Sequence, residues 1–311
     1  MNRSEARHQL IAALLQADGP VTLDELLAGL PVAPQLAKDI LAELADRGQV
    51  VAGRLSAGSS HTRYVWAARW EEQTRDRSAG SRNVLTQIVD PADVVPAGRL
   101  AIDSRPVLAF HDYVINRYTP PADKRMLVFL QCSVRRPFSS SPSHGSMRRA
   151  IRLATGFGPA RDFEACPVHV VVLASRIGPV PYELEDVYPA NAGGGGVKHF
   201  GGEHYARVRP ILAGRMADYI TTHRGRYDHV ATFTDGRYGE VMADARETAG
   251  ADFPIFPAAD GPRVRRMGAS TPRTYWQKFW IQLYLEIVSW LKPAARAQAA
   301  ARLRELDVEY G

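Results

Sequence analysis

The sequence predicts an α/β protein in which a winged helix-turn-helix precedes a mostly parallel sheet that helices cover on both faces. Three continuous apolar runs, KRMLVFLQCS, PVHVVVLAS and YDHVATFTD, are typical of strands that are buried on both sides. Amphipathic stretches separate these runs, and such strand–helix alternation favours a parallel sheet. Residues 1–70 instead combine three short helical patterns with two strand patterns, which is the composition of a winged helix.

The composition is that of a globular protein, because 45% of the 311 residues are hydrophobic and 23% are charged. The formal charge of +6 suits a polyanionic partner. The sequence contains no run of eighteen apolar residues and no signal-peptide pattern, so we expect no membrane association. The two cysteines lack CxxC spacing, which indicates a reducing, cytoplasmic compartment and no zinc ribbon. We expect neither a metal nor a cofactor.

Residues 1–70 are expected to form the winged-helix domain. Ser4 can cap the first helix, and Thr22 with Glu25 three residues later makes a capping box for the second. A third helix over residues 35–47 is followed by the strands QVVAGRL and TRYVWAAR, with SAGSSH between them as the wing.

In such modules the third helix usually enters the major groove, while the wing contacts phosphates or the minor groove. The alternative is that the domain binds a protein or packs on its own catalytic domain, since the third helix carries few basic residues. The candidate nucleic-acid contacts are Gln35 and Lys38 on the helix and Arg54, His61 and Arg63 on the wing.

Residues 71–100 are polar and contain prolines, so we interpret them as a linker. Residues 101–311 then form the α/β domain with helices at its C-terminal end. Pro106 can begin the first helix of this domain, because proline suits the first turn of a helix. Further helices are expected at 145–154, 204–222 and 275–291, and from Pro293 to Leu306.

The chemistry is expected beyond the carboxyl ends of the strands, where open parallel sheets bind their ligands. The loop after the first strand, CSVRRPFSSSPSH, contains a cysteine, serines and two arginines and leads into a helix. Such a loop can hold an anion or a polar ligand, and a helix N-terminus favours a thiolate. The candidates in this loop are Cys132, Ser133, Arg136, Ser139, Ser141, Ser143 and His144.

Two roles stay open for Cys132. It can be a nucleophile with His144 as general base or proton donor, or it can be a small buried side chain that ends a strand. In the second loop, Glu183 and Glu185 are either paired carboxylates for acid–base chemistry or a solvated turn. Asp235 follows the third strand, where it can hold a substrate NH group.

Two of these segments resemble the catalytic core of archaeosine synthase. The loop matches that family's pattern PCSxxKPYSxSxSH, and PVPYELEDVYPAN is similar to its P-R-E-L-E…YPA segment. The resemblance covers roughly residues 101–250 and shows neither the transglycosylase-like nor the PUA domain of that family. Three positions depart from the pattern: Gln131 replaces proline, Arg136 replaces lysine and Phe138 replaces tyrosine.

The resemblance implies a three-layer sheet domain similar to uracil-DNA glycosylase and action on the nitrile of 7-cyano-7-deazaguanine within a nucleic acid. The expected reaction is hydration of that nitrile to the amide in DNA, as in the bacterial 7-deazaguanine DNA-modification systems, whose other proteins would be partners. Cys132 is expected to attack the nitrile, with His144 or Glu185 moving protons. Arg136 and the loop serines would hold the base edge or a nearby phosphate, and Asp235 the deazaguanine NH groups.

Two alternatives remain open at this point. One is an archaeosine-synthase-like transfer of an amine, lysine, to the same base in tRNA. The other, from a different class, is a winged-helix DNA-binding regulator that senses a nucleotide or free deazaguanine without turnover.

Overall fold

The computed structural model describes residues 2–17, 21–46, 49–53, 62–66, 88, 100–134, 136–192, 196–268 and 271–311. The chain divides into two compact units, Met1–Phe110 with Asp186–Gly194, and His111–Glu185 with Gly195–Gly311. The expected boundaries at residues 70 and 100 stay a prediction. None of the helices that the structure describes is both long and apolar enough to span a membrane.

Among its described residues, the first unit contains the helices α1, α2 and α3 and a small antiparallel sheet with strand order β1-β3-β2. The first helix begins after Asn2, which forms a capping box with Glu5, so Ser4 lies inside the helix and does not cap it. The predicted capping box of Thr22 and Glu25 is present at the second helix. In chain order the elements are α1 (Arg3–Gln16), β1 (Val21–Thr22), α2 (Leu23–Leu27), α3 (Pro34–Asp46), β2 (Val50–Gly53) and β3 (Arg63–Trp66).

The second unit is built on a five-stranded sheet with strand order β6-β5-β4-β7-β8, which confirms the α/β class. Only β6 runs antiparallel, and it pairs with β5. All seven residues of β5 are buried, and so are five of the six in β4, as their continuous apolar runs predict. The strands are β4 (Met126–Gln131), β5 (Val168–Ala174), β6 (Gly178–Pro181), β7 (His229–Phe233) and β8 (Ile255–Phe256).

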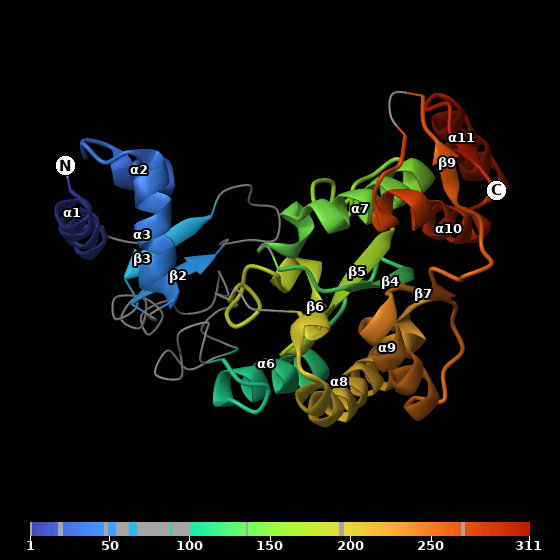
Figure 1. Cartoon of the computed structure of the whole chain (residues 1–311), viewed down its shortest axis with the longest axis horizontal. Helices are drawn as coiled ribbons and strands as arrows, with labels where there is room; N and C mark the ends of the chain where they lie inside the picture. Colours follow the sequence, from blue (N-terminus) through green and yellow to red (C-terminus); the bar gives the residue numbers. More distant parts are fainter. Residues whose placement is uncertain are drawn as a thin grey trace. The chain divides into compact units, whose positions relative to one another are not determined.

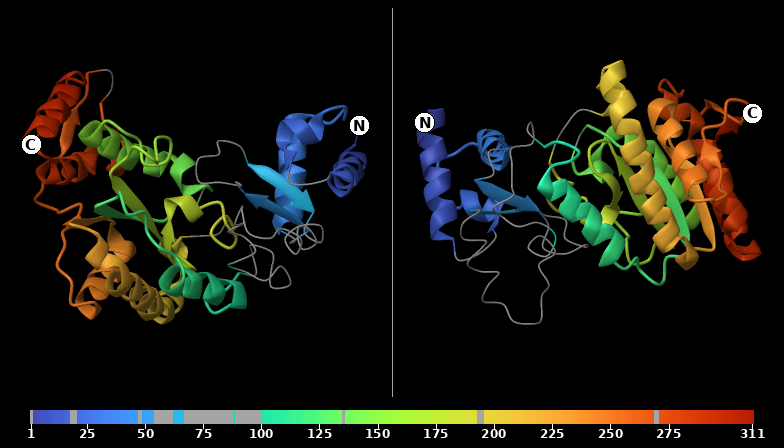
Figure 2. Two further views of the ribbon diagram at one scale, coloured as in Figure 1. Left: turned by 180° about the vertical axis from the view of Figure 1, so that it is seen from behind. Right: turned by 90° about the horizontal axis from the view of Figure 1, so that it is seen from below.

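Helices cover both faces of this sheet. On one face α7 packs against α10 and α11, and on the other α8 packs against α9 (Figures 1 and 2). The helix that precedes β4, α6 (Arg105–Asn116), contains Pro106 in its first turn, as predicted. The remaining helices are α7 (Pro142–Thr155), α8 (Gly202–His223), α9 (Gly236–Thr248), α10 (Tyr275–Trp290) and α11 (Pro293–Arg304). A two-stranded sheet, β9 (Val264–Arg266) with β10 (Glu309–Tyr310), completes the C-terminal part.

The order of the strands creates a switch point beside β4. The chain leaves β4 through α7 to reach β5 on one side, whereas it leaves β7 through α9 to reach β8 on the other side. The loops after β4 and β7 therefore diverge at neighbouring carboxyl ends, and such divergence opens a crevice in α/β sheets. The fold thus places the cysteine-containing loop where a ligand site is expected.

Candidate active site

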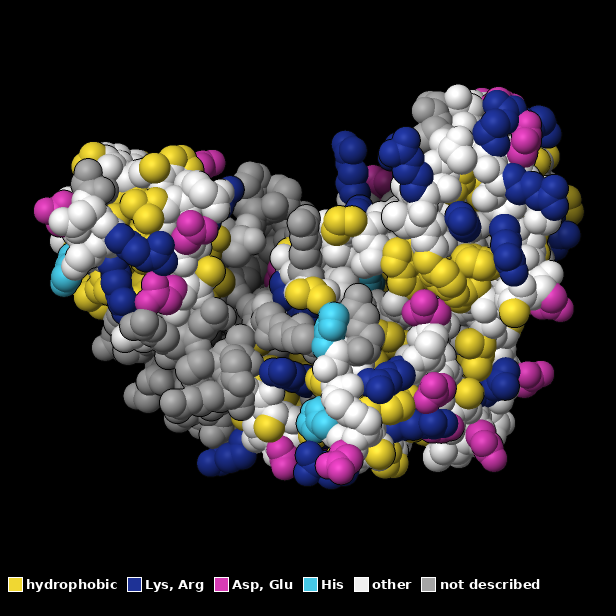
Figure 3. Space-filling view, viewed as in Figure 1, with side chains coloured by type: hydrophobic (Ala, Val, Ile, Leu, Met, Phe, Trp, Pro, Cys, Tyr) yellow, Lys and Arg dark blue, Asp and Glu magenta, His cyan; other side chains and the backbone are white. Residues whose placement is uncertain are grey.

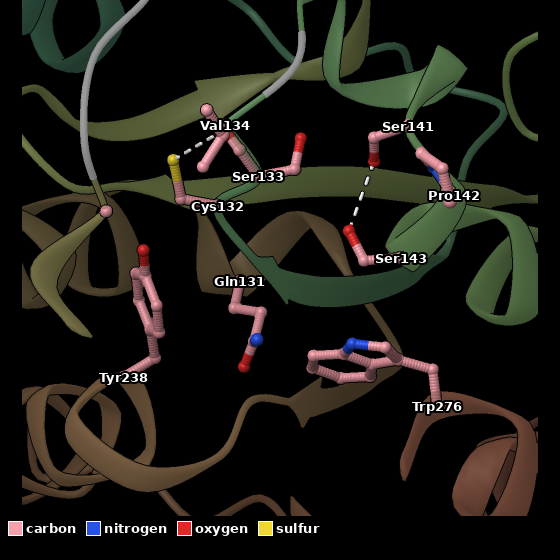
Figure 4. A pocket seen from close by; sticks show the side chains of 10 residues that line it. Gln131, Cys132, Ser133, Val134, Ser141, Pro142, Ser143, Tyr238 and Trp276 are labelled. Atoms are coloured by element: carbon pink, nitrogen blue, oxygen red, sulfur yellow. Dashed lines mark hydrogen bonds between the residues drawn. The ribbon is translucent and has the colours of Figure 1, made fainter. Parts of the chain in front are cut away.

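A pocket of about 210 Å³ lies at this switch point. The loop after β4 and the first turn of α7 form one wall, and Tyr238 of α9 and Trp276 of α10 form the opposite side (Figure 4). Ser141 is the N-cap of α7, so the amino end of that helix borders the pocket. The lining residues are Gln131, Cys132, Ser133, Val134, Ser141, Pro142, Ser143, Gly196, Tyr238 and Trp276.

Cys132 contributes a thiol to the lining of this pocket. Its backbone N–H donates to the Leu173 carbonyl at 3.1 Å, which extends the pairing of β4 and β5 by one residue and fixes the position of the sulfur. The side chain is 7% exposed, and Sγ lies 3.3 Å from the Ser133 carbonyl oxygen. The Arg136 guanidinium approaches the same sulfur, with Nη2 at 3.7 Å.

Arg136 also holds the loop together. It donates to the Ser133 carbonyl, and its guanidinium carbon lies 3.9 Å from the centre of the Phe138 ring. The stacked position limits the freedom of the guanidinium, because a planar cation over an aromatic face is held by the ring quadrupole. Arg136 therefore supports the sulfur from the side of the loop, and it is not among the residues that line the pocket.

His144 lies behind the pocket wall and not inside it. Its Nε2 is 2.8 Å from the Gln131 carbonyl oxygen and its Nδ1 is 2.6 Å from the Tyr182 hydroxyl. A carbonyl can only accept, so Nε2 carries the proton and Nδ1 accepts from Tyr182. Burial, opposed by the hydrogen bond to Gln131, lowers the pKa of His144 to about 3. Both ring nitrogens are thus committed to neighbours, which favours a positioning role over acid–base chemistry with Cys132.

This burial predicts a pH dependence of stability. The unfolded chain binds a proton on His144 near its ordinary pKa of 6.5, whereas the folded protein does so only near 3. The contribution is therefore complete above pH 6.5 and is lost as the pH falls toward 3. Between pH 6.5 and 5 we expect this residue alone to remove about 2 kcal/mol of the free energy of unfolding.

Urea unfolding at pH 7 and pH 5 measures this effect. The difference between the two pH values should shrink in His144→Gln and stay as in the wild type when the exposed His204 is changed to Gln. An unchanged difference in His144→Gln would show that the ring is protonated in the folded protein.

Ser139 and Glu185 form a buried pair that ties two loops together. The Glu185 carboxylate accepts from the Ser139 backbone N–H at 2.7 Å and from the Ser139 hydroxyl at 2.5 Å. Glu185 is 2% exposed and Ser139 is 5% exposed, and neither lines the pocket. Their geometry supports a role in holding the short 3₁₀ turn Phe138–Ser140, which leads from the cysteine loop into α7.

Glu183 belongs to a second buried polar cluster, away from Cys132. Its carboxylate lies 3.1 Å from His169 Nε2 and accepts from the Tyr118 hydroxyl, while His169 Nδ1 lies 2.6 Å from the Tyr227 hydroxyl. Burial raises the pKa of Glu183, but the charge and hydrogen bond of His169 and the hydrogen bond of Tyr118 outweigh it, so the net pKa is lowered. The structure therefore does not bring Glu183 together with the loop serines.

Gln131 links the two loops that diverge at the switch point. Its side-chain oxygen accepts from the Asp235 backbone N–H at 2.9 Å, at the start of α9. Asp235 is the N-cap of that helix and is not among the residues that line the pocket. Figure 4 shows the Gln131 side chain between the rings of Tyr238 and Trp276.

Tyr238 and Trp276 are pocket residues that the sequence did not indicate as candidates. The Tyr238 hydroxyl lies 2.8 Å from the Ser175 hydroxyl, directly after β5. Burial, and then the neighbouring Cys132, raise the pKa of Tyr238. In the sequence, Tyr238 is marked as a site residue only by its position in the loop DGRYGE after the third strand. Trp276 is one of several aromatic residues in a predicted helix, and nothing in the sequence distinguishes it from the others.

The candidate nucleic-acid contacts of the first unit are only partly described. Gln35 and Lys38 are exposed on α3, and the Gln35 side-chain NH₂ donates to Asp39 at 2.9 Å. Arg63 belongs to β3, but its side chain lies outside the described set, as do Arg54 and His61 entirely. Within the described ranges no group of three or more His, Cys, Asp or Glu side chains could hold a metal ion.

The sequence is similar to archaeosine synthases. It is 33% identical over 147 residues to archaeosine synthase subunit alpha of Methanosarcina acetivorans, which covers 47% of this chain and 21% of that protein. It is 38% identical over 79 residues to archaeosine synthase subunit alpha of Thermococcus kodakarensis, which covers 25% and 13%. The chain thus spans less than a quarter of the length of these curated relatives.

The alignment with a crystal structure of AF0587, a protein of unknown function, covers 49% of this chain and 44% of that chain at 21% identity, with a TM-score of 0.32. A family model described as a domain of unknown function, DUF5591, matches residues 107–265, which include all three long strands and the cysteine loop. The chain therefore belongs to the DUF5591 family.

Proposed function

We propose that the chain modifies the nitrile of a 7-cyano-7-deazaguanine base that is already part of a nucleic acid. The observation that carries this proposal is the position of Cys132, buried at the wall of a switch-point pocket and bordered by Arg136 and the amino end of α7. The same loop carries the motif that the chain shares with archaeosine synthase. A pocket with one thiol, hydroxyl groups and two aromatic rings suits a flat heterocycle with a weak electrophile.

The proposed reaction begins at the sulfur. The Cys132 thiolate attacks the nitrile carbon, so a C–S bond forms, one C–N π bond breaks and the nitrogen takes up a proton, giving a thioimidate. A nucleophile then adds to the same carbon, and the thiolate leaves. An amine gives an amidine, whereas water gives the amide, and the overall reaction needs no oxidant or reductant.

Tyr238 is the proposed proton donor to the nitrile nitrogen. It lines the pocket together with Cys132, and its raised pKa keeps the phenol protonated at neutral pH. Ser175 is hydrogen-bonded to the phenol oxygen and holds it in place. For His144 and Glu185, the donors expected from the sequence, we propose that they hold the pocket wall through their hydrogen bonds to Gln131 and Ser139.

Tyr238→Phe tests this role. We expect turnover to fall by about 100-fold with little change in substrate binding, because one positioned general acid is lost while the ring remains. Single-turnover kinetics on the modified base measure the chemical step directly. Tyr205→Phe is the matched control, since its hydroxyl bonds Glu240 and the Arg237 carbonyl outside the pocket. Equal rates for wild type and Tyr238→Phe would assign the proton to another donor.

Amine transfer to the base in tRNA is the reaction that the archaeosine synthase similarity favours. One observation favours hydration, in DNA or elsewhere, as the second candidate. Arg136 stands where the family motif has lysine, and its guanidinium is used to hold the loop beside the sulfur. A change of this group next to the reacting atom is consistent with a different second substrate, such as water.

The N-terminal unit is proposed to be a winged-helix module that presents the nucleic acid. Its order of helices and strands, with β1 pairing to β3, supports this assignment. Of the candidate contacts, Gln35 and Lys38 on α3 have exposed, described side chains, and Lys38 carries the positive charge. Lys38→Ala should weaken binding of any nucleic acid to a similar extent and should lower its salt dependence, because a phosphate contact carries no sequence information.

The decisive experiment supplies DNA and tRNA that carry 7-cyano-7-deazaguanine, each with and without lysine, and measures nucleoside masses after digestion. A lysine adduct on tRNA supports the transferase, and a gain of one water without lysine supports the hydratase. No change on either substrate would contradict both reactions. It would favour the third candidate, a regulator that binds DNA and a deazaguanine without turnover.

A further inference from the structure

An aromatic cluster, made of Tyr275, Trp276 and Phe279, stands at the start of α10. The centres of the Tyr275 and Trp276 rings lie 5.4 Å apart, and those of Tyr275 and Phe279 lie 4.6 Å apart. Tyr275 is 39% exposed, which is unusual for a large ring within an aromatic cluster. Figure 3 shows hydrophobic side chains gathered on the molecular face over the start of α10.

The cluster continues directly from the pocket. Trp276 lines the pocket and packs against Phe233 at the end of β7, with ring centres 5.8 Å apart. Thr274 forms a capping box with Gln277, so the first turn of α10 that carries these rings is fixed in direction. The exposed Tyr275 therefore stands directly beside a ring that lines the pocket.

Basic residues predominate in the sequence around the cluster, and one carboxylate lies near it, because burial and then the charge of Asp235 raise the pKa of Tyr275. Residues 263–278 include four arginines and one lysine and contain no Asp or Glu. The Arg263 guanidinium carbon lies 5.2 Å from the centre of the Phe279 ring, and both Arg273 and Lys278 are exposed beside the cluster in sequence. Aromatic rings combined with cations are the features with which proteins bind single-stranded nucleic acid.

The angle between the rings indicates how two neighbouring bases of a bound nucleic-acid strand would be oriented. The planes of Tyr275 and Trp276 are 85° apart. A base stacked on each ring would therefore be nearly perpendicular to the other base, whereas neighbouring bases in a helix are parallel. This is the arrangement of a base that has turned out of the stack beside a neighbour that has not entered the pocket.

We propose that this cluster is a stacking platform for single-stranded nucleic acid, with Trp276 under the target base and Tyr275 against the adjacent base. This assignment rests on the proposed function in that the target base belongs to a nucleic acid. It goes further because it names a second base and the residue that holds it. It also requires that the strand be unpaired at the site, since Tyr275 can stack only on a free base face.

Binding of an ordinary oligonucleotide tests the platform without any chemistry. The probe is a fluorescein-labelled single strand of unmodified bases, and anisotropy gives its Kd for the full chain. We expect Tyr275→Ala to raise Kd by about 10-fold and Tyr275→Phe to leave it unchanged, because stacking needs the ring but not the hydroxyl. The matched control is Phe157→Ala, which removes a ring that is 42% exposed at the opposite end of α7 from the pocket.

The duplex of the same sequence should bind more weakly and should be insensitive to Tyr275→Ala. Equal Kd values for wild type and Tyr275→Ala, or an equal loss in Phe157→Ala, would overturn the platform. A change of oligomeric state in Tyr275→Ala without a change in Kd would also overturn it, because the ring would then face a second copy. Tyr275-dependent binding without conversion of the nitrile would keep the platform and contradict the proposed reaction.

Discussion

Cys132→Ser should lower turnover of the nitrile substrate by roughly 1,000-fold or more, because a serine hydroxyl stays protonated at neutral pH where a thiol supplies thiolate. Binding should persist, since the substitution changes one atom in a wall that Ser133, Ser141 and Ser143 also form. Single-turnover kinetics separate these two effects. Mass spectrometry of the denatured wild type should in addition detect a protein adduct of the base on Cys132.

Cys166→Ser is the control for this experiment. Burial raises the pKa of Cys166 to about 11, so this thiol is not a nucleophile at neutral pH, and it does not line the pocket. Its replacement should leave the rate per folded molecule unchanged. Turnover in Cys132→Ser close to that of the wild type would mean that the sulfur makes no covalent bond and that the loop only binds.

Glu183→Gln should lower the free energy of unfolding by about 3 kcal/mol at pH 7, because it removes the charged acceptor of a buried hydrogen-bonded network. His169 and the Tyr118 hydroxyl would lose a charged acceptor while they remain buried. The effect depends on pH, since the pKa of Glu183 is lowered in the folded protein. The stabilisation is present above the ordinary pKa of 4.5 and is lost as the pH falls through the lower folded value.

Urea unfolding of Glu183→Gln from pH 7 down to pH 4 measures this prediction, with the exposed Glu203→Gln as control. The variant should approach the wild type at the acid end. At a temperature where Glu183→Gln is folded, its KM should equal that of the wild type. A raised KM with unchanged stability would show that Glu183 contacts the substrate, as the sequence suggested.

The buried strands were predictable because their apolar runs are continuous. All three long strands lie where KRMLVFLQCS, PVHVVVLAS and YDHVATFTD indicated. The strand β6 was not predicted from the sequence, because its residues, GPVP, include two prolines, which are tolerated only at the edge of a sheet. The helix α9 was not predicted either, because its first residues, GRYGE, include two glycines and resemble a turn.

The reactive loop was predictable, but its surroundings were not. Cys132 and three serines meet in the pocket because they lie on one short loop. His144 lies on the same segment, yet its ring points toward Gln131 and Tyr182, and no pattern in the sequence gives that direction. Trp276 reaches the pocket only through the packing of α10 against α7, a contact between elements more than 100 residues apart.

Trp276 and the cysteine loop line the same pocket but come from different parts of the chain. The cysteine loop lies inside the DUF5591 match at residues 107–265, whereas Trp276 comes from a helix beyond it. A different α10 on the same sheet would therefore change the Trp276 wall of the pocket, while the pairing of Cys132 with β5 belongs to the family core. Chimeras that exchange residues 271–291 between relatives would therefore vary this wall of the pocket separately from the cysteine loop.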